Sequence, residues 1–272
     1  MFDFQKYLRL EMFPHMLCPG CGHGIVLGAL LRAIDSLKLS QDEVVVVSGI
    51  GCSSRLSGYV DFDTLHTTHG RPLAFATGIK MARPELTVIV ITGDGDGLSI
   101  GGNHLIHAAR RNVGLTCLLL NNEIYGMTGG QSAPTTPLGK ISTTGPTGPF
   151  ETPFDSCRLV EAAGASFVAR GITYEPSTLE KLIVAAIQNP GFSFLEIISD
   201  CPEFFGRFNR MGNPADQILA QKQNVVDAKT AATLPPERLK GKMLTGILHH
   251  EPRPEYAASY QESIAHMSMQ AR

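Results

Sequence analysis

Four apolar runs along the chain have the length and composition of buried β-strands. They are Glu43–Ser48, Thr87–Thr92, Leu115–Leu120 and Phe192–Ser199, and each is followed directly by Gly, Asn or Asp. Near-continuous hydrophobic runs of this length are typical of parallel strands that are covered on both faces. In open α/β sheets, the functional loops follow the carboxyl ends of such strands.

The segments between these runs have helical periodicity. They are His23–Lys38, Leu73–Met81, Asn103–Arg111, Asp155–Ala163 and Ser177–Gln188. Strands that alternate with helices predict an α/β fold with a doubly wound, mostly parallel sheet. A chain of 272 residues is long enough for one such domain with a tail.

Two regions lack these patterns. Gly126–Pro153 contains five prolines and many Gly, Thr and Ser residues, so we expect a functional loop or lid there. The tail after Cys201 shows no strand pattern and has scattered prolines. We therefore expect a main domain over residues 1–205 and an irregular C-terminal extension over residues 206–272 that makes subunit contacts.

Composition narrows the class of partner. The net charge is −2 with 18% charged residues, so we expect small molecules and proteins as partners and no nucleic acid. The apolar runs are far shorter than the roughly 20 residues of a membrane span, and the first residues do not resemble a secretory signal. These features predict a cytoplasmic protein without membrane contact. In a reducing compartment, the six cysteines are metal ligands, redox groups or buried small side chains rather than a disulfide framework.

Polar motifs follow the second and third predicted strands. Gly93–Gly97 is GDGDG, and Asn121–Gly126 is NNEIYG. An aspartate and an asparagine at neighbouring strand ends supply oxygen ligands that suit Mg²⁺ or Ca²⁺. The glycines allow a diphosphate to approach the backbone, and a helix that begins near Gly101 offers free N–H groups to anions. Taken alone, GDGDG is also compatible with a tight turn.

The spacing of the two motifs adds a more specific hypothesis. Gly-Asp-Gly, 25 intervening residues and Asn-Asn together resemble the thiamine diphosphate signature. That resemblance implies that Asp94, Asn122 and the backbone carbonyl of Ile124 hold Mg²⁺ against the diphosphate of the cofactor.

Four of the cysteines have positions that favour a shared site. Cys18 and Cys21 form a CxxC pair, while Cys52 and Cys201 follow the first and fourth predicted strands. If the sheet is parallel, these thiolates meet at one edge, where zinc and an iron–sulfur cluster are both compatible with four cysteines. Thiamine diphosphate chemistry favours the cluster, because its electron-rich intermediates can pass electrons to iron but not to zinc.

The other two cysteines belong to regular structure. Cys117 lies within the third predicted strand and Cys157 on a helix face, so we expect both to be buried small side chains.

Five segments together strongly resemble the β subunit of 2-oxoacid:ferredoxin oxidoreductases, particularly the 2-oxoglutarate type. They are CPGCGHG, GIGCSSR, THGRPLAFATGIK, GDGDG and NNEIYGMTGGQSAPT, and the resemblance continues to residues 201–216. It implies decarboxylation of a 2-oxoacid on thiamine diphosphate, transfer of electrons through a 4Fe-4S cluster to ferredoxin, and release of an acyl-CoA. For 2-oxoglutarate and coenzyme A, the products are succinyl-CoA and CO₂, and the reaction is reversible.

The resemblance also implies site residues and partners. Both cofactors belong to the domain of residues 1–205, with Cys18, Cys21, Cys52 and Cys201 as cluster ligands. The residues expected to contact thiamine diphosphate are Ile50, Gly51, Cys52, Ser53, His69, Gly95, Asp96, Gly126 and Met127. The carboxylate that activates the aminopyrimidine ring comes from an α subunit in this family. The chain is therefore expected to be inactive alone and to assemble as a dimer of α–β pairs.

The second carboxylate of 2-oxoglutarate requires a cationic or hydrogen-bonding partner. His66, His69 and Arg71 are the candidate catalytic residues, and His66 is the first choice for contact with substrate, because His69 and Arg71 resemble cofactor-loop scaffold. Arg55 is a further candidate.

Three alternatives remain open. The first is a β subunit of a pyruvate or broad-specificity 2-oxoacid oxidoreductase. The second is a thiamine enzyme without redox chemistry, which has no need of four converging cysteines. The third is a zinc-stabilised, non-catalytic subunit, which predicts a colourless protein without thiamine dependence.

Overall fold

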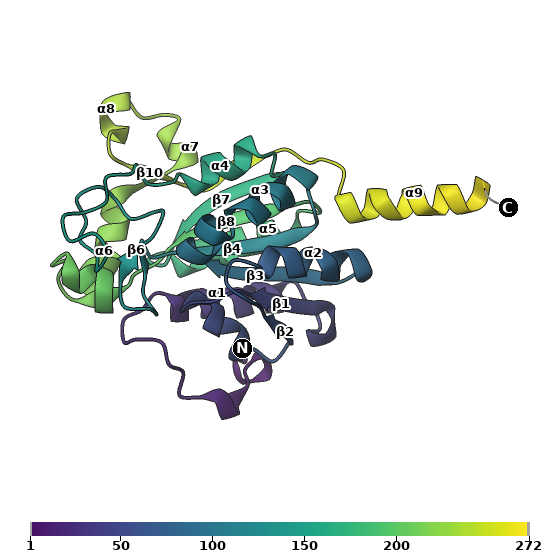
Figure 1. Ribbon diagram of the computed structural model, residues 1–272, viewed down its shortest axis with the longest axis horizontal. Coiled ribbons are helices and arrows are strands. Elements are labelled where there is room, and N and C mark those ends of the chain that lie inside the picture. Colours follow the sequence, from purple (N-terminus) through teal and green to yellow (C-terminus); the bar gives the residue numbers. More distant parts are fainter. Residues whose placement is uncertain (1, 271–272) are drawn as a thin grey trace.

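The computed structural model describes residues 2–270, and an eight-stranded sheet with helices on both faces forms its centre (Figure 1). The strand order is β2-β1-β3-β4-β8-β7-β10-β9. The bounds are β1 Val44–Ser48, β2 Asp63–His66, β3 Thr87–Gly93, β4 Leu115–Asn121, β7 Phe167–Ile172, β8 Ser193–Ile198, β9 Val225–Asp227 and β10 Met243–His250. The first six strands in this order, β2, β1, β3, β4, β8 and β7, are mutually parallel, and β10 is antiparallel to β7. The predicted α/β fold with a mostly parallel sheet is confirmed.

Helices α1 to α5 form two layers around the sheet, and α6 to α9 belong to the C-terminal part of the chain. Their bounds are α1 His23–Ser36, α2 Pro72–Ala82, α3 Gly102–Arg111, α4 Ser156–Ala162, α5 Pro176–Gln188, α6 Pro214–Asn224, α7 Ala228–Ala231, α8 Pro236–Leu239 and α9 Tyr256–Gln270. Helices α1 and α5 share one hydrophobic core with the sheet, and α2, α3 and α4 share the other. In β1, Val44 and Val46 belong to the first core, and Val45 and Val47 belong to the second. This alternation explains the continuous apolar run, because successive side chains point to opposite covered faces.

The four strands expected from apolar runs are β1, β3, β4 and β8, which are adjacent in the centre of the sheet. The flanking strands have weaker patterns. Strand β2 is an edge strand with mostly exposed side chains, and β7 contains Arg170 and Gly171. Apolar continuity therefore identifies only the strands that are buried on both faces by hydrophobic neighbours.

The two regions without a clear pattern have different structures. The loop of residues 126–153 is irregular apart from a short pair, β5 Ile124–Tyr125 with β6 Gln131–Ser132. The tail was expected to lack strands, but β10 adds to the main sheet beside β7, and β9 pairs with β10. Strand β10 was not visible in the sequence because it lies at the sheet margin with half-exposed side chains. Helix α9 extends away from the body (Figure 1).

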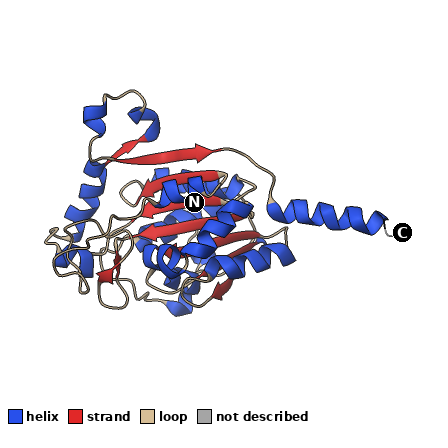
Figure 2. Ribbon diagram, turned by 45° about the horizontal axis from the view of Figure 1, so that its top comes forward, coloured by secondary structure: helices blue, strands red, loops and turns tan. Residues whose placement is uncertain are grey.

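Loops gather at the carboxyl edge of the parallel strands, the end toward which their arrows point (Figure 2). A π-helical turn, Gly95–Ile100, follows β3 there and leads directly into α3. Within residues 2–270, no helix combines the length and the apolar character that a membrane crossing requires.

We predict that the core around β8 contributes strongly to stability. Phe194 is fully buried between the sheet and α4, whereas Phe150 is 91% exposed. Phe194→Ala should lower the free energy of unfolding by about 3–5 kcal/mol, because it removes buried apolar surface and leaves a cavity. Phe150→Ala should change it by less than about 0.5 kcal/mol. Urea unfolding followed by circular dichroism measures both, and equal effects would contradict the described core.

Candidate functional site

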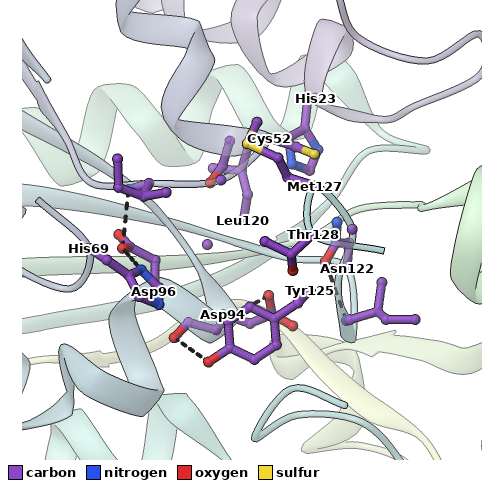
Figure 3. Close-up of a pocket in the computed structure, with 17 residues that line it drawn as sticks. His23, Cys52, His69, Asp94, Asp96, Leu120, Asn122, Tyr125, Met127 and Thr128 are labelled. Atoms are coloured by element: carbon purple, nitrogen blue, oxygen red, sulfur yellow. Dashed lines mark hydrogen bonds and ion pairs between the residues drawn. The ribbon is translucent and has the colours of Figure 1, made fainter. Parts of the chain in front are cut away.

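A cavity of about 180 Å³ lies at the carboxyl edge, between the loops that follow β1, β3 and β4 (Figure 3). The nine residues expected to contact the cofactor all line it: Ile50, Gly51, Cys52, Ser53, His69, Gly95, Asp96, Gly126 and Met127. Asp94, Asn122 and Ile124, the expected Mg²⁺ ligands, line it as well. The structure therefore brings residues from four separate segments to one place, although their contact with a cofactor stays a prediction.

Asp94 follows β3 and is buried, with 3% of its surface exposed. Its carboxylate accepts hydrogen bonds from the Thr135 hydroxyl at 2.6 Å and from the Gly95 N–H at 2.9 Å. Burial raises the pKa of this carboxyl to about 6, because the charged form loses hydration. Two donors leave lone pairs of the carboxylate free, and a divalent cation supplies the positive charge that the surroundings lack. The Asp94 carboxylate therefore fits the role of a Mg²⁺ ligand.

Asn122 and Ile124 lie on a tight turn at the end of β4. Glu123, between them, has φ +62°, a left-handed conformation that is uncommon for a residue other than glycine. The Ile124 N–H donates to the Asn122 side-chain oxygen at 3.4 Å, and the Thr136 hydroxyl donates to the Glu123 carbonyl at 2.6 Å. Such strained residues persist where surrounding contacts hold them, and they cluster at functional sites.

Tyr125 closes one side of the cavity. Its hydroxyl donates to the Gly95 carbonyl at 3.0 Å. A Cβ atom at Gly95 would overlap with the Tyr125 ring. The second glycine of GDGDG is therefore required by close packing against this ring, in addition to any approach of a diphosphate.

Asp96 holds the walls of the cavity together. One carboxylate oxygen accepts from the Ile50 N–H at 3.2 Å, from His69 Nδ1 at 2.6 Å and from the Gly70 N–H at 2.6 Å. The other accepts from the Thr92 hydroxyl at 2.6 Å. The carboxylate is thus fully used within the chain. Asp96 was expected at the diphosphate, and the structure shows that it also connects the loops after β1 and β2 to the end of β3.

The three candidate catalytic residues lie in different surroundings. His69 lines the cavity, with 40% of its side chain exposed. His66 is exposed at the end of the edge strand β2 and does not line the cavity, and neither does Arg71. Arg71 donates to the Ile100 carbonyl at 3.3 Å, which joins its loop to the π-helical turn. Arg55 is exposed beside a second cavity.

That second cavity, of about 310 Å³, is lined by all four cysteines expected to bind a cluster: Cys18, Cys21, Cys52 and Cys201. A Cβ atom at Gly126 would lie 3.4 Å from the Cys201 sulfur and 3.7 Å from the Cys52 sulfur. Among residues 2–270, no three His, Cys, Asp or Glu side chains converge closely enough to bind one ion directly. The thiols instead surround a space with room for a group of several atoms.

The thiols are poorly stabilised as anions in the chain alone. Burial, followed by repulsion from the neighbouring cysteines, raises the pKa of Cys21 to about 12 and that of Cys52 to about 11. Burial also raises the pKa of Cys201. Thiolates in this position require a metal cation beside them, and four cysteines around a space of this size fit an iron–sulfur cluster. Cys117 and Cys157 are buried in the second core, as expected from their positions in regular structure.

His23 lines the first cavity and was missed by sequence reasoning. It is the first residue of α1, is 1% exposed and has its Nδ1 atom 3.0 Å from the Ser199 hydroxyl. Burial lowers the pKa of His23 to about 4, so the imidazole is neutral near pH 7. The available signal was its position two residues after Cys21, the second cysteine of the CxxC pair. The prediction that helix α1 begins there implied that His23 lies at the same edge as the cysteines.

Comparisons with known proteins agree with this geometry. Residues 49–197 match the family model described as "Thiamine pyrophosphate enzyme, C-terminal TPP binding domain". The chain is 51% identical over 252 residues to "2-oxoglutarate synthase subunit KorB" of Methanothermobacter marburgensis, covering 93% of this chain and 88% of the relative. It is 35% identical to "2-oxoacid:ferredoxin oxidoreductase subunit beta" of Saccharolobus solfataricus, covering 92% and 86% of the two chains.

One solved structure has nearly the same fold along the whole chain. It is "2-oxoglutarate:ferredoxin oxidoreductase from Magnetococcus marinus with 2-oxoglutarate, coenzyme A and succinyl-CoA bound". The TM-score is 0.87 at 34% sequence identity, and the match covers 98% of this chain and 91% of that chain.

We predict that Asp96 is necessary for the folded shape of this edge. Asp96→Ala leaves buried donors without an acceptor and should lower the free energy of unfolding by about 3 kcal/mol. Asp96→Asn retains an acceptor for these donors, because the Thr92 hydroxyl can reverse its role, and should cost about 1 kcal/mol. Urea titration of both variants is the measurement. Equal losses would show that the hydrogen bonds to Asp96 do not determine its contribution.

Proposed function

The chain belongs to the family of β subunits of 2-oxoacid:ferredoxin oxidoreductases, and we propose that it is the β subunit of a 2-oxoglutarate:ferredoxin oxidoreductase. The reaction is oxidative decarboxylation of 2-oxoglutarate with coenzyme A to succinyl-CoA and CO₂, with electrons passed to ferredoxin. One observation supports it above all. Cys52, Asn122, Gly126 and Met127 line both cavities, so the expected thiamine site and the expected cluster site share a wall.

The first cavity suits a diphosphate bound through Mg²⁺. Asp94, Asn122 and the carbonyl of Ile124 would hold the metal ion, and the N–H groups of the turn that begins at Gly95 would face the diphosphate. When bound, thiamine diphosphate would supply the nucleophilic carbon and the electron sink that decarboxylation of a 2-oxoacid requires. The chain positions that cofactor with residues from loops held together by Asp96.

His69 has the surroundings of a group that acts beside the cofactor. Because the Asp96 carboxylate accepts from Nδ1 at 2.6 Å, that nitrogen carries a proton and Nε2 is the ring nitrogen available to a ligand. A histidine oriented by a buried carboxylate can exchange a hydrogen bond or a proton with a substrate oxygen. We therefore favour His69 over His66 as the residue that contacts substrate.

A partner chain must complete the site. Among residues 2–270, Asp94 and Asp96 are the acidic side chains that line the first cavity. Asp96 is fully hydrogen-bonded and Asp94 is assigned to the metal, so neither is free to activate the aminopyrimidine ring. We include in the proposal an α subunit that supplies this carboxylate, a dimer of α–β pairs, and a cytoplasmic location, which suits six free cysteines.

The preference for 2-oxoglutarate over pyruvate rests on the names of relatives. Relatives that are 49% to 51% identical are named 2-oxoglutarate synthase subunits, whereas the relative with the broader name is 35% identical. Met127, which lies at both cavities, is followed by the small residues Thr128, Gly129 and Gly130. Of these three, Thr128 lines the first cavity, where its short side chain would leave room for the longer chain of 2-oxoglutarate.

We predict a 4Fe-4S cluster in the complex of this chain with its α subunit. Anaerobic preparations should be brown, contain about four iron atoms per β chain and bleach with 2-oxoglutarate plus coenzyme A. Cys21→Ala should lose the iron yet still bind thiamine diphosphate, because Cys21 does not line the first cavity. The control Cys117→Ala, in the core of β4, should keep both. Iron, sulfide and zinc analysis decides the matter, since one zinc per chain in a colourless protein would remove the redox function.

We also predict that His69 and His66 differ in the assembled enzyme. His69→Ala should reduce kcat/KM for 2-oxoglutarate about 100-fold, the usual effect of removing a proton-transfer group. His66→Ala should leave kcat and the Kd of thiamine diphosphate close to wild type, because its side chain is outside the cavity. Kinetics with 2-oxoglutarate and with pyruvate test both. A larger loss in His66→Ala, confined to 2-oxoglutarate, would instead assign the second substrate carboxylate to His66.

A further inference from the structure

Behind the turn that carries Asn122 and Ile124 lies a network of buried polar side chains that the proposed reaction does not use directly. Asn121, Glu196 and Arg170 come from β4, β8 and β7, which are neighbours in the sheet. They are 5%, 2% and 7% exposed. All three line a cavity on the far side of the turn and none lines the thiamine cavity, so their effect on a cofactor must be indirect.

Successive hydrogen bonds connect this network to the turn. Arg170 Nε donates to Glu196 Oε2 at 2.5 Å, and Asn121 Nδ2 donates to Glu196 Oε1 at 2.9 Å. The Asn121 side-chain oxygen then accepts from the Glu123 N–H at 3.1 Å. Glu123 is the residue with positive φ, so this last bond holds the strained step between Asn122 and Ile124.

The network is itself firmly anchored. Arg170 also donates to the Asp155 carboxylate at 3.0 Å and to the Leu244 carbonyl at 3.2 Å, which connect it to the start of α4 and to β10. A buried ion pair of this kind contributes little stability compared with apolar side chains of the same volume. Its presence in the middle of an apolar sheet is better explained by the geometry that it imposes on Asn121.

We propose that Glu196 and Asn121 are positioning residues for the Mg²⁺ of the thiamine site, with Arg170 holding Glu196 in place. The inference rests on the proposed function, since it concerns the metal of that cofactor. Side chains that orient metal ligands without touching the metal typically change metal affinity about 10- to 100-fold when they are removed.

Donor and acceptor exchange provides a specific test. In Glu196→Gln, the side chain has one acceptor and one donor end, so it cannot accept from both Arg170 and Asn121. In Asn121→Asp, two carboxylates face each other. Each variant should raise the Kd of Mg²⁺ about 10- to 100-fold at saturating thiamine diphosphate. In the double variant N121D/E196Q, the introduced glutamine can accept from Arg170 and donate to the introduced aspartate, so the Kd should return toward the wild-type value.

A matched control separates positioning from general stability. Asn189 bonds to the Ser166 and Ser193 hydroxyls, both at 3.0 Å, at the opposite end of β7 and β8. Asn189→Ala should lower the Tm while leaving the Kd of Mg²⁺ unchanged. Asn121→Ala keeps the Arg170–Glu196 pair but removes the bonds of the Asn121 side chain to Glu196 and to the Glu123 N–H, and it serves if the Glu196 variants do not fold.

The measurement is calorimetric titration of the assembled α–β complex with Mg²⁺, with the Tm of the metal-free complex recorded for each variant. Wild-type affinity in Asn121→Ala and Asn121→Asp would falsify the inference, as would equal weakening in Asn189→Ala at the same loss of Tm. If the wild-type complex itself bound no Mg²⁺ with thiamine diphosphate, the proposed function would fail, which is a separate result.

Discussion

Neighbouring parallel strands end at the same edge of a sheet, and this constraint determines where the chemistry of the chain lies. Strands β1, β3, β4 and β8 are adjacent and parallel, so the residues that follow them are brought together from distant parts of the sequence. The loop after β1 supplies Cys52, the loop after β3 supplies Asp94, and the turn after β4 supplies Asn122. The segment after β8 supplies Cys201, which completes the second cavity. Reversing one of these strands would separate the two cavities.

Buried charges at this edge fall into two classes. Asp96 and Glu196 have their oxygens occupied by donors of the chain, so their charges serve the shape of the protein. Asp94 accepts only two hydrogen bonds and the cysteines are less well compensated still, and burial raises the pKa of the Asp94 carboxyl and of the Cys21 and Cys52 thiols. A folded chain tolerates uncompensated anionic groups only when a cation accompanies them or when they are protonated. These groups therefore lie where the proposed function places Mg²⁺ and the iron–sulfur cluster.

The sequence was sufficient for the parts of the fold that depend on burial alone. The central strands were visible because both of their faces are covered by apolar cores, which makes their sequences continuously hydrophobic. Helices α1 to α5 were visible because each buries one face, which gives its sequence a helical period. Strands β2 and β7 were missed for opposite reasons, since β2 is an exposed edge strand and β7 contains the buried Arg170, whose partner Glu196 is distant in sequence. Motif spacing pointed to Asp94 and Asn122, and the positions at strand ends pointed to the cysteines; these residues line the two cavities, while their binding of Mg²⁺ and of a cluster stays a prediction. It could not show that Asp96 connects three loops or that His23 lies beside them, because those contacts exist only once the strands are paired.

The cavity is open on the side where chemistry requires exclusion of water. Ile50 and Met127 line it and are 41% and 40% exposed, although apolar side chains at a catalytic site gain from burial. Electrostatic effects of groups such as His69 and Asp94 become stronger when water is excluded. In the proposed complex, an α subunit that covered Ile50 and Met127 would close the cavity, and the same contact would deliver the carboxylate that activates thiamine. Closure of the cavity and completion of the catalytic groups would then be one event, which agrees with the expectation that the chain is inactive without its partner.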